Sequence, residues 1–414
     1  MKLNDICKIG SSKRIHLSDY VENGVPFYRS KEIIELSEGN PVSEPLFISH
    51  EKFSEIKHKF PIPKTNDILI TSVGTLGVVH LVKDPNFYFK DGNLTWLREF
   101  NENIIDIDFL FYWLNSNLFK KQILNNNIGA VQKAITIDFL KKVDISLPDI
   151  PNQKSIAAVL STVDKKIALN KQINARLEEM AKTLYDYWFV QFDFPDANGK
   201  PYKSSGGEMV FDETLKREIP KGWEVKSLGE IENNIVTGKT PSTQYSNFFN
   251  GDIPFITIGD IRNNTFIIKT GQNLSIEGAN NQKNKYLPEG SLCVSCIATV
   301  GLIGFTTRQA QTNQQINSII FKHDYNKEFL YFYLKDYFLV GKAKTGNTFA
   351  NMNKGDFEKI LVLYPNLRLL QKYSNKMVLV LNQINNLSKQ NHQLTQLRDF
   401  LLPMLMNGQV SVAE

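Results

Sequence analysis

The chain has 414 residues, more than one ordinary hydrophobic core supports and enough for two domains with connecting elements. A composition of 42% hydrophobic and 22% charged residues is typical of globular proteins and excludes a disordered or fibrous class. The net charge of +5 permits a polyanionic partner without requiring one. The sequence has no apolar run of about 18 residues and no signal-peptide pattern at its start, so we expect a cytoplasmic location and no membrane contact.

The three cysteines are Cys7, Cys293 and Cys296. Three thiols in a chain of this length do not make a disulfide scaffold and suit a reducing compartment. Cys293 and Cys296 form a single pair inside a strand-like run, without a second pair or nearby histidines. We therefore expect them to pack in a core and predict no metal site.

Several sequence blocks occur twice, in the same order and with similar spacing. Two of them indicate strands that run into turns, one a buried helix, one a polar loop and one a short segment before the end of the repeat. The pairs are 25–33 with 253–261, 68–77 with 292–301, 109–114 with 329–334, 129–133 with 346–350, and 138–140 with 356–358. This order indicates two related domains in tandem.

Each repeat ends in a long stretch whose apolar residues recur at steps of three and four, the heptad pattern of a coiled coil. Each stripe also carries an asparagine, Asn170 or Asn391, and a buried asparagine can set helix register. The alternative is that each helix packs only on its own domain, for which a shorter helix would suffice. The stripe residues are Ile156, Leu160, Val163, Ile167, Ile173, Leu177, Met180, Leu184 and Tyr187 in the first stretch, and Leu370, Tyr373, Met377, Val380, Ile384, Leu387, Leu394, Leu397 and Leu401 in the second.

The segment between the repeats is rich in Gly, Pro, Ser and charge and has no sustained period, so it is interpreted as a connector. The predicted fold class is α+β: two tandem α/β domains related by a pseudo-two-fold axis and separated by two long antiparallel coiled-coil helices. The predicted parts are domain 1–148, helix 149–190, linker 191–222, domain 223–365, helix 366–406 and tail 407–414.

Several motifs resemble those of one family. They are IPKGWEVKSLGEI at 219–231, TGKTP at 237–241, GDIPFI at 251–256, GKPYKSSGGEMV at 199–210, and helix entries from Pro148 to Gln153 and, more loosely, from Pro365 to Gln371. In these motifs the chain resembles the DNA-specificity subunits of type I restriction–modification systems, over essentially its whole length and with both target-recognition domains. The first half departs from the pattern, since it opens with KLNDI at 2–6 and lacks the Gly-Trp-Glu start.

The resemblance implies a non-catalytic reader of double-stranded DNA. Each recognition domain would read one half of a split, asymmetric site, and the two antiparallel helices would set the gap. Two methyltransferase subunits carrying S-adenosylmethionine would dock on the helices, and restriction (motor–nuclease) subunits using ATP and Mg²⁺ would join them. No cofactor is implied for this chain itself.

Base reading needs donors and acceptors on short loops: Arg and Lys pair with guanine, Asn and Gln with adenine. Every Lys and Arg could instead contact phosphate, and the amide-rich run 311–317 could be a solvated loop. The candidates are Tyr28, Arg29, Ser30, Lys31, Ser72, Thr75, Gln132 and Lys133 in the first half, and Thr257, Asp260, Arg262, Thr299, Asn313, Gln314, Gln315, Asn317, Asn347, Thr348 and Asn351 in the second.

Three patterns imitate catalytic motifs. TGKT at 237–240 resembles the end of a P-loop, but Asn233 stands where the first glycine belongs. DPNF at 84–87 resembles the tetrapeptide of amino-methyltransferases but lacks its second proline, and a turn explains it better. Pro148-Asp149 followed by Asp164-Lys165-Lys166 resembles a nuclease motif. Asp164, however, falls on the predicted coiled-coil helix, where an accessible metal site is implausible.

Two other functions stay open at this point. A self-contained DNA methyltransferase is opposed by the missing cofactor and catalytic motifs, and binding of S-adenosylmethionine by the isolated chain would support it. A coiled-coil scaffold without a DNA role would be supported by failure to shift DNA even with partners present. We favour the DNA reader, chiefly because of the resemblance.

Overall fold

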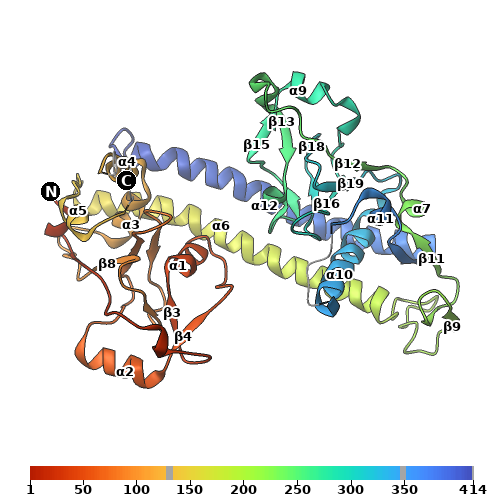
Figure 1. The fold of residues 1–414 in the computed structure, drawn as a ribbon, viewed down its shortest axis with the longest axis horizontal. Helices are drawn as coiled ribbons and strands as arrows, with labels where there is room; N and C mark the ends of the chain where they lie inside the picture. Colours follow the sequence, from red (N-terminus) through yellow and green to blue (C-terminus); the bar gives the residue numbers. More distant parts are fainter. Residues whose placement is uncertain (127–133, 346–350, 413–414) are drawn as a thin grey trace. The chain divides into compact units, whose positions relative to one another are not determined.

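The structure is a computed structural model that describes residues 1–126, 134–345 and 351–412, with only the backbone for 342–345 (Figure 1). The chain forms two compact units, residues 1–168 with 393–414 and residues 169–392. Helices α6 (Ile150–Tyr185) and α12 (Leu367–Met406) each contribute to both units. No helix in the described part of the chain is long and apolar enough to cross a bilayer.

The first unit contains two small sheets. The main sheet is antiparallel, in the order β1 (Lys8–Gly10), β8 (Leu94–Arg98), β5 (Ile68–Thr71) and β6 (Val79–Leu81). The second sheet has the order β2 (Tyr20–Val21), β4 (Leu46–Ile48), β3 (Val25–Tyr28) and β7 (Tyr88–Phe89), with β3 and β7 parallel. The helices are α1 (Ser30–Ser37), α2 (His50–Lys59), α3 (Ile107–Asn115), α4 (Asn117–Asn126) and α5 (Ile137–Lys142).

The second unit repeats this plan. Its main sheet has the order β12 (Ile235–Thr237), β19 (Ile316–Ile319), β16 (Leu292–Ser295), β17 (Ile303–Thr306) and β14 (Phe266–Ile267). A smaller sheet has the order β15 (Gln272–Leu274), β13 (Phe249–Ile256) and β18 (Gln311–Thr312), with β13 and β18 parallel. The remaining elements are the pair β11 (Glu224–Ser227) and β20 (Leu361–Tyr364), and helices α7 (Leu228–Ile231), α8 (Ile258–Ile261), α9 (Ile276–Asn280), α10 (Lys327–Thr345) and α11 (Lys354–Glu358).

The predicted sequence repeat is confirmed by this matching topology. The order β1-β8-β5-β6 in the first unit corresponds to β12-β19-β16-β17 in the second. The order β4-β3-β7 corresponds likewise to β15-β13-β18, with one parallel pair at the same place. The repeated aromatic block forms α3 in one unit and the start of α10 in the other, and both pack in the core of their unit. The two halves therefore share one fold, as the order of the repeated blocks indicated.

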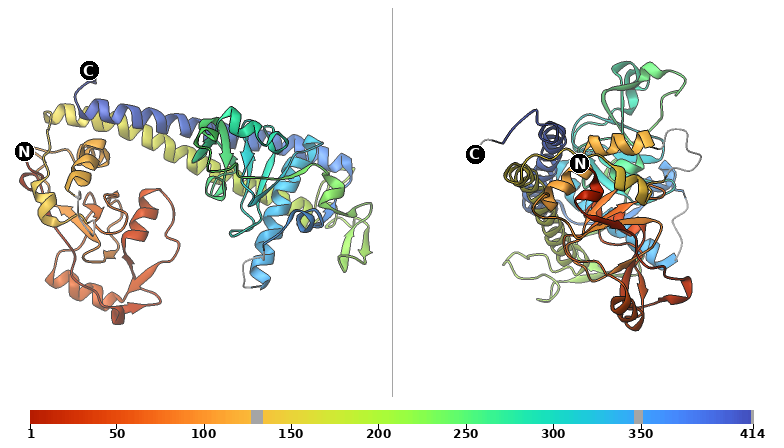
Figure 2. Two further views of the ribbon diagram at one scale, coloured as in Figure 1. Left: turned by 45° about the horizontal axis from the view of Figure 1, so that its top comes forward. Right: turned by 90° about the vertical axis from the view of Figure 1, so that its left-hand side faces the viewer.

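Inside each unit, apolar residues of the two long helices share one core cluster, and the helices run antiparallel (Figure 2). In the second unit the Nδ2 of Asn170 donates to the Oδ1 of Asn391 at 2.9 Å, and the Nδ2 of Asn174 donates to Ser388 Oγ at 3.2 Å. In the first unit Asp164 Oδ1 accepts from Arg398 at 2.9 Å. The prediction that the two stripe asparagines lie in the seam is confirmed.

The stripe prediction holds for most positions. Buried residues are Ile156, Leu160, Leu370, Tyr373, Met377, Ile384 and Leu387, and half-buried ones are Val163, Ile167, Leu177, Leu184, Val380, Leu394 and Leu401. It is wrong for Met180, which is 64% exposed, for Leu397 at 46%, and for Ile173 and Tyr187 at 36% and 37%. These side chains point away from the other long helix. The strip of residues that two helices bury against each other is narrower than the full set of apolar positions in the sequence.

The segment interpreted as a connector contains regular secondary structure. A π-helical turn (Asp186–Val190) ends α6, and β9 (Met209–Asp212) pairs with β10 (Arg217–Pro220) as a hairpin. The rings of Phe194 and Tyr202 stack with centroids 4.6 Å apart, and Phe194 also stacks on Trp223 at 5.4 Å. Aromatic packing orders a segment whose composition alone resembles a loose linker.

Glu328 on α10 is a buried carboxyl, 5% exposed, that accepts a hydrogen bond from Ser374 Oγ at 2.8 Å. Burial is the main cause that raises its pKa, so the folded chain binds the proton more tightly than the unfolded chain. Stability contributed by this group is present at low pH and is lost as pH rises through the raised pKa. We expect Glu328→Gln to increase the free energy of unfolding by about 1 kcal/mol at pH 7 and to give no gain near pH 4. Urea unfolding at both pH values measures this, and an equal effect at both would contradict it.

Candidate nucleic-acid interface

Three loops of the first unit meet at one end of its main sheet. Strands β1 and β5 end there and β6 and β8 begin there, because neighbouring strands of this sheet are antiparallel. The loops that leave this end are residues 11–14, 72–78 and 90–93. We call them the first rim. The end of β3 adjoins it, since the backbone N–H of Lys90 donates to the carbonyl of Tyr28 at 2.8 Å.

The second unit has an equivalent set of loops, residues 238–241, 296–302 and 313–315, which we call the second rim. They leave the matching ends of β12, β16 and β17, and β19. Here the N–H of Asn313 donates to the carbonyl of Ile256 at 3.1 Å, which repeats the contact between Lys90 and Tyr28. The fold thus brings loops far apart in the sequence to one edge in each unit.

A strand-end hydroxyl folds the hairpin loop of both rims in the same way. In the first rim Thr71 Oγ1 donates to the carbonyl of Thr75 at 2.6 Å and accepts from the N–H of Val78 at 2.9 Å. In the second rim Ser295 Oγ donates to the carbonyl of Thr299 at 2.5 Å and accepts from the N–H of Leu302 at 2.8 Å. The repeated blocks 68–77 and 292–301 therefore encode one turn geometry.

Several predicted base readers of the first half have structural partners. Arg29 makes a 2.5 Å ion pair with the buried Glu32, while Lys31 pairs with Glu44 at 2.8 Å. Ser72 is 4% exposed and its hydroxyl lies 2.6 Å from that of Thr95, so the expectation that this side chain reaches a base is wrong.

The other first-half candidates lie at or beside the rim. The ring of Tyr28 stacks on Phe87 with centroids 4.7 Å apart. Ser30 Oγ donates to the carbonyl of Asn93 at 3.3 Å. Thr75 is exposed in the turn. Gln132 and Lys133 lie outside the described residues.

In the second half, Asp260 caps α8. Its Oδ2 accepts from the N–H and the hydroxyl of Thr257, each at 2.8 Å, and its Oδ1 accepts from the N–H of Gly271 at 2.7 Å. Both carboxylate oxygens thus have partners within the chain, Oδ2 in the cap of α8, and base reading by Asp260 stays a prediction. Arg262, which follows α8, is exposed.

The amide-rich run separates into buried and exposed residues. Asn313 Nδ2 donates to Gln315 Oε1 at 3.0 Å, which ties these two amides to each other. Asn317 is 2% exposed and accepts from Thr237 Oγ1 at 2.7 Å, so the expectation that it reaches a base is wrong. Gln314 is exposed. It is therefore the amide of this run that points outward.

The last candidates lie around the second hairpin. Thr299 is half-buried, and Asn351 Oδ1 accepts from the N–H of Ala298 at 3.3 Å, which joins the start of the last described segment to the rim. Asn347 and Thr348 lie outside the described residues.

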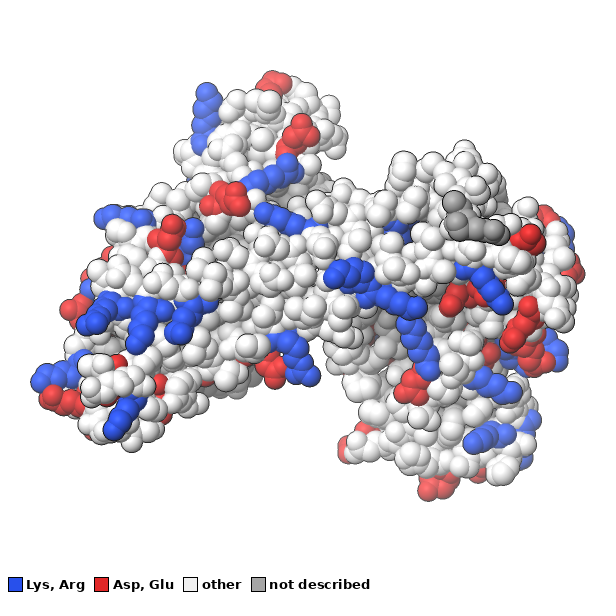
Figure 3. Space-filling model, turned by 180° about the vertical axis from the view of Figure 1, so that it is seen from behind, with Lys and Arg blue, Asp and Glu red and all other residues white. Residues whose placement is uncertain are grey.

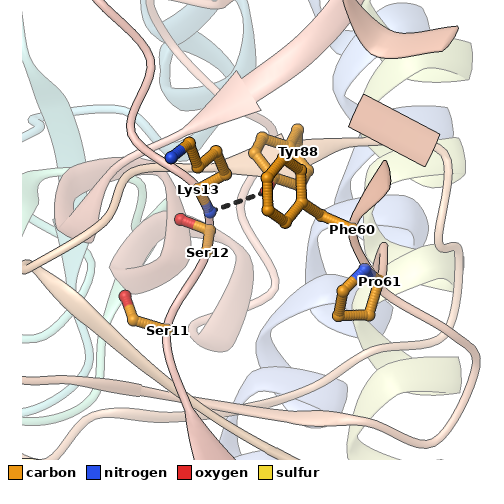
Figure 4. Close-up of a pocket in the computed structure, with 6 residues that line it drawn as sticks. All are labelled: Ser11, Ser12, Lys13, Phe60, Pro61 and Tyr88. Carbon is orange, nitrogen blue, oxygen red and sulfur yellow. Dashed lines mark hydrogen bonds between the residues drawn. The ribbon is translucent and has the colours of Figure 1, made fainter. Parts of the chain in front are cut away.

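The sequence reasoning missed the loop that follows the first strand of each main sheet. In the first rim it lines a hollow of about 140 Å³, together with Phe60, Pro61 and Tyr88 (Figure 4). The N–H of Lys13 donates to Tyr88 Oη at 2.8 Å, and its Nζ lies 5.2 Å from the centre of the Phe60 ring. A cation beside an aromatic wall suits a nucleotide edge.

In the second rim the same loop is TGKTP, the pattern set aside as a P-loop imitation. A Cβ on Gly238 would lie 2.1 Å from the carbonyl oxygen of Asn313, so this glycine allows two backbones to approach closely. Gly238 is needed where this loop packs against the backbone of residues 312–313. The glycine in TGKTP was therefore the sequence feature that could have indicated that this loop belongs to the site.

On the face that Figure 3 draws, charged side chains are spread over the described residues. The face in Figure 3 shows basic and acidic side chains interspersed, with some basic ones in short rows. In the first unit the last turn of α2 carries Lys57, His58 and Lys59. This distribution suits recognition by defined loops, with phosphate contacts from scattered cations.

The cysteines are core residues, as predicted for Cys293 and Cys296. These two are 0% and 2% exposed, and burial raises the pKa of the Cys293 thiol to about 12 and of Cys296 to about 11. Within the described ranges, no three His, Cys, Asp or Glu side chains are grouped to hold a metal ion. We expect no reaction of these thiols with a thiol reagent at pH 8 until the chain is unfolded, since the thiolate is the reactive form. Labelling of the folded chain at either position would contradict the packing.

Two α/β units that share one topology and carry equivalent polar rims, each with a segment of both long helices, are typical of a protein with two similar binding surfaces. Residues 1–179 and 220–397 match the family described as the type I restriction modification DNA specificity domain. The chain belongs to this family.

Characterised relatives agree with this membership. The type I restriction enzyme HindI specificity subunit of Haemophilus influenzae is 35% identical over 365 residues, covering 75% of this chain and 79% of that protein. The MjaIX specificity subunit of Methanocaldococcus jannaschii is 27% identical over 433 residues, covering 100% and 93%. A crystal structure of the type I restriction–modification S subunit from M. genitalium covers 98% of this chain and 95% of that one, with a TM-score of 0.54 and 16% identity, and it supports the fold alone. The predicted family, α+β fold class and specificity-subunit role are confirmed.

Proposed function

We propose that each unit reads one half of a split, asymmetric DNA site, with the first and second rims as the reading surfaces. The reading domains in this proposal are residues 1–148 and 223–365. The observation that carries it is the repetition of one rim, with one hairpin geometry, in two units of a chain from a DNA-specificity family. Two equivalent surfaces suit a duplex, whose local two-fold symmetry offers equivalent grooves.

In the same proposal the helices α6 and α12 set the gap between the half-sites. At 1.5 Å per residue a helix of 36 residues is roughly 54 Å long, against about 34–36 Å for one turn of DNA. The outward faces of these helices carry exposed apolar residues, including Met180 and Leu397, which would suit docking of protein partners.

The proposed partners are double-stranded DNA, two methyltransferase subunits and restriction subunits. S-adenosylmethionine would be bound by the methyltransferase subunits, and ATP and Mg²⁺ by the restriction subunits. This chain would determine which DNA sequence is bound, and the other subunits would carry out the catalysis. We expect the complex to work in the cytoplasm.

The test is to co-express the chain with the methyltransferase subunit of its system and to map methylated adenines across a host genome. The expected result is one motif of two short half-sites separated by a fixed gap. Absence of methylation, with a stable complex and a methyltransferase that is active with another specificity subunit, would overturn the proposal. It would favour the scaffold alternative.

A further inference from the structure

In each rim, among the described residues, one pair of side chains joins the first loop to the loop that precedes the last strand of the main sheet in chain order, which is β8 or β19. In the first rim Arg14 Nε donates to Asp91 Oδ2 at 3.1 Å, across 77 residues of sequence. The Arg14 side chain is 71% exposed and that of Asp91 is 19% exposed. Asp91 therefore binds Nε of Arg14, and Nη1 and Nη2 keep no partner among the described residues.

In the second rim the same two loops are joined by a different pair. Thr240 Oγ1 donates to Gln314 Oε1 at 2.7 Å, across 74 residues of sequence. This bond orients the amide of the exposed Gln314. The second lone pair of Oε1 and the two N–H donors of Nε2 remain for a ligand.

The two outward groups have the chemistry of two different bases. A guanidinium fork donates twice and matches the O6 and N7 acceptors of guanine. An amide with a free acceptor site and a free donor matches N6 and N7 of adenine. In each pair one partner is half-buried, Asp91 or Thr240, and the other is exposed, Arg14 or Gln314. A pair that served only to hold two loops together would not need one exposed partner.

We propose that Arg14 discriminates for guanine in the half-site read by the first unit and that Gln314 discriminates for adenine in the half-site read by the second. Asp91 and Thr240 are positioning residues that orient the two readers. The inference rests on the proposed function, because it assigns bases to the rims that this function uses. It predicts that one half-site contains a guanine read by Arg14 and that the other contains an adenine read by Gln314.

The experiment maps methylated adenines for the chain co-expressed with its methyltransferase subunit and for the variants Arg14→Ala and Gln314→Ala. For Arg14→Ala we expect one position, occupied by guanine in the unaltered motif, to accept other bases, with discrimination there reduced about ten-fold or more. The gap and the other half-site should not change. For Gln314→Ala the same relaxation should occur at one adenine of the other half-site.

Arg14→Lys separates base reading from phosphate contact, because lysine keeps the charge and loses the fork. We expect it to relax the motif as Arg14→Ala does. Thr240→Val should relax the same position as Gln314→Ala, to a smaller extent. Lys142→Ala and Asn233→Ala are matched controls on exposed residues near the opposite ends of the two sheets, and neither should alter the motif.

The outcomes separate the two proposals. A split motif that keeps its bases in Arg14→Ala and Gln314→Ala would overturn this inference and leave the proposed function intact. A uniform loss of methylation with an unrelaxed motif, restored by Arg14→Lys, would assign Arg14 to phosphate and overturn its role as a reader. Absence of any split motif for the unaltered chain would overturn the proposed function and this inference together.

Discussion

Duplicating seven residues in both long helices will widen the gap of the recognised site and leave both half-sites unchanged. The duplicated segments are 162–168 in α6 and 386–392 in α12. Each segment ends at the residue where the chain passes from one unit to the other. Seven residues add about 10 Å of helix, or up to roughly three base pairs of DNA. A heptad is chosen because it keeps the apolar stripe in phase, so the seam can still form. Mapping methylated adenines measures the gap directly.

The matched control duplicates the heptad in only one of the two helices. A single insertion lengthens the chain between the units in one helix and not in the other, so the two stripes cannot keep their register in both units, and we expect methylation to be lost. A changed half-site with an unchanged gap in the double insertion would show that the helices do not act as the spacer.

Replacing Gly238 by alanine will abolish or strongly impair recognition by the second unit. The added Cβ would lie 2.1 Å from the carbonyl oxygen of Asn313 and 2.4 Å from that of Thr312. Both contacts are with backbone, so the loop 238–241 must move away from the turn that carries Gln314. We expect methylation of the wild-type motif to fall at least about ten-fold, and the free energy of unfolding to fall by about 1–3 kcal/mol.

Gly259→Ala is the control in the same unit, because the nearest atom to its Cβ would be Thr257 Oγ1 at an ordinary 3.8 Å. It should keep both the motif and the stability. Methylation rates and urea unfolding measure the two effects. Wild-type rate and motif in Gly238→Ala would mean that the close approach of these loops is not needed for reading.

The sequence by itself determined the properties that depend on local pattern. The segments ILIT at 68–71 and LCVS at 292–295 predict strands, and both form strands whose residues are all buried. Heptad spacing predicts long helices, and repeated blocks predict two copies of one domain. These predictions succeed because strand and helix periodicity arise from neighbours a few residues apart.

The tertiary structure alone decided which polar side chains face outward. Ser72 and Asn317 lie on loops or strands of the right composition but are buried by contacts with distant residues. Arg14 and Gln314 point outward because partners 77 and 74 residues away hold them. The fold of the segment that follows α6 likewise depends on tertiary contacts, namely the stacking of Phe194 with Tyr202 and with Trp223. Such contacts join residues far apart in the chain, and the spacing within any one segment carries no information about them.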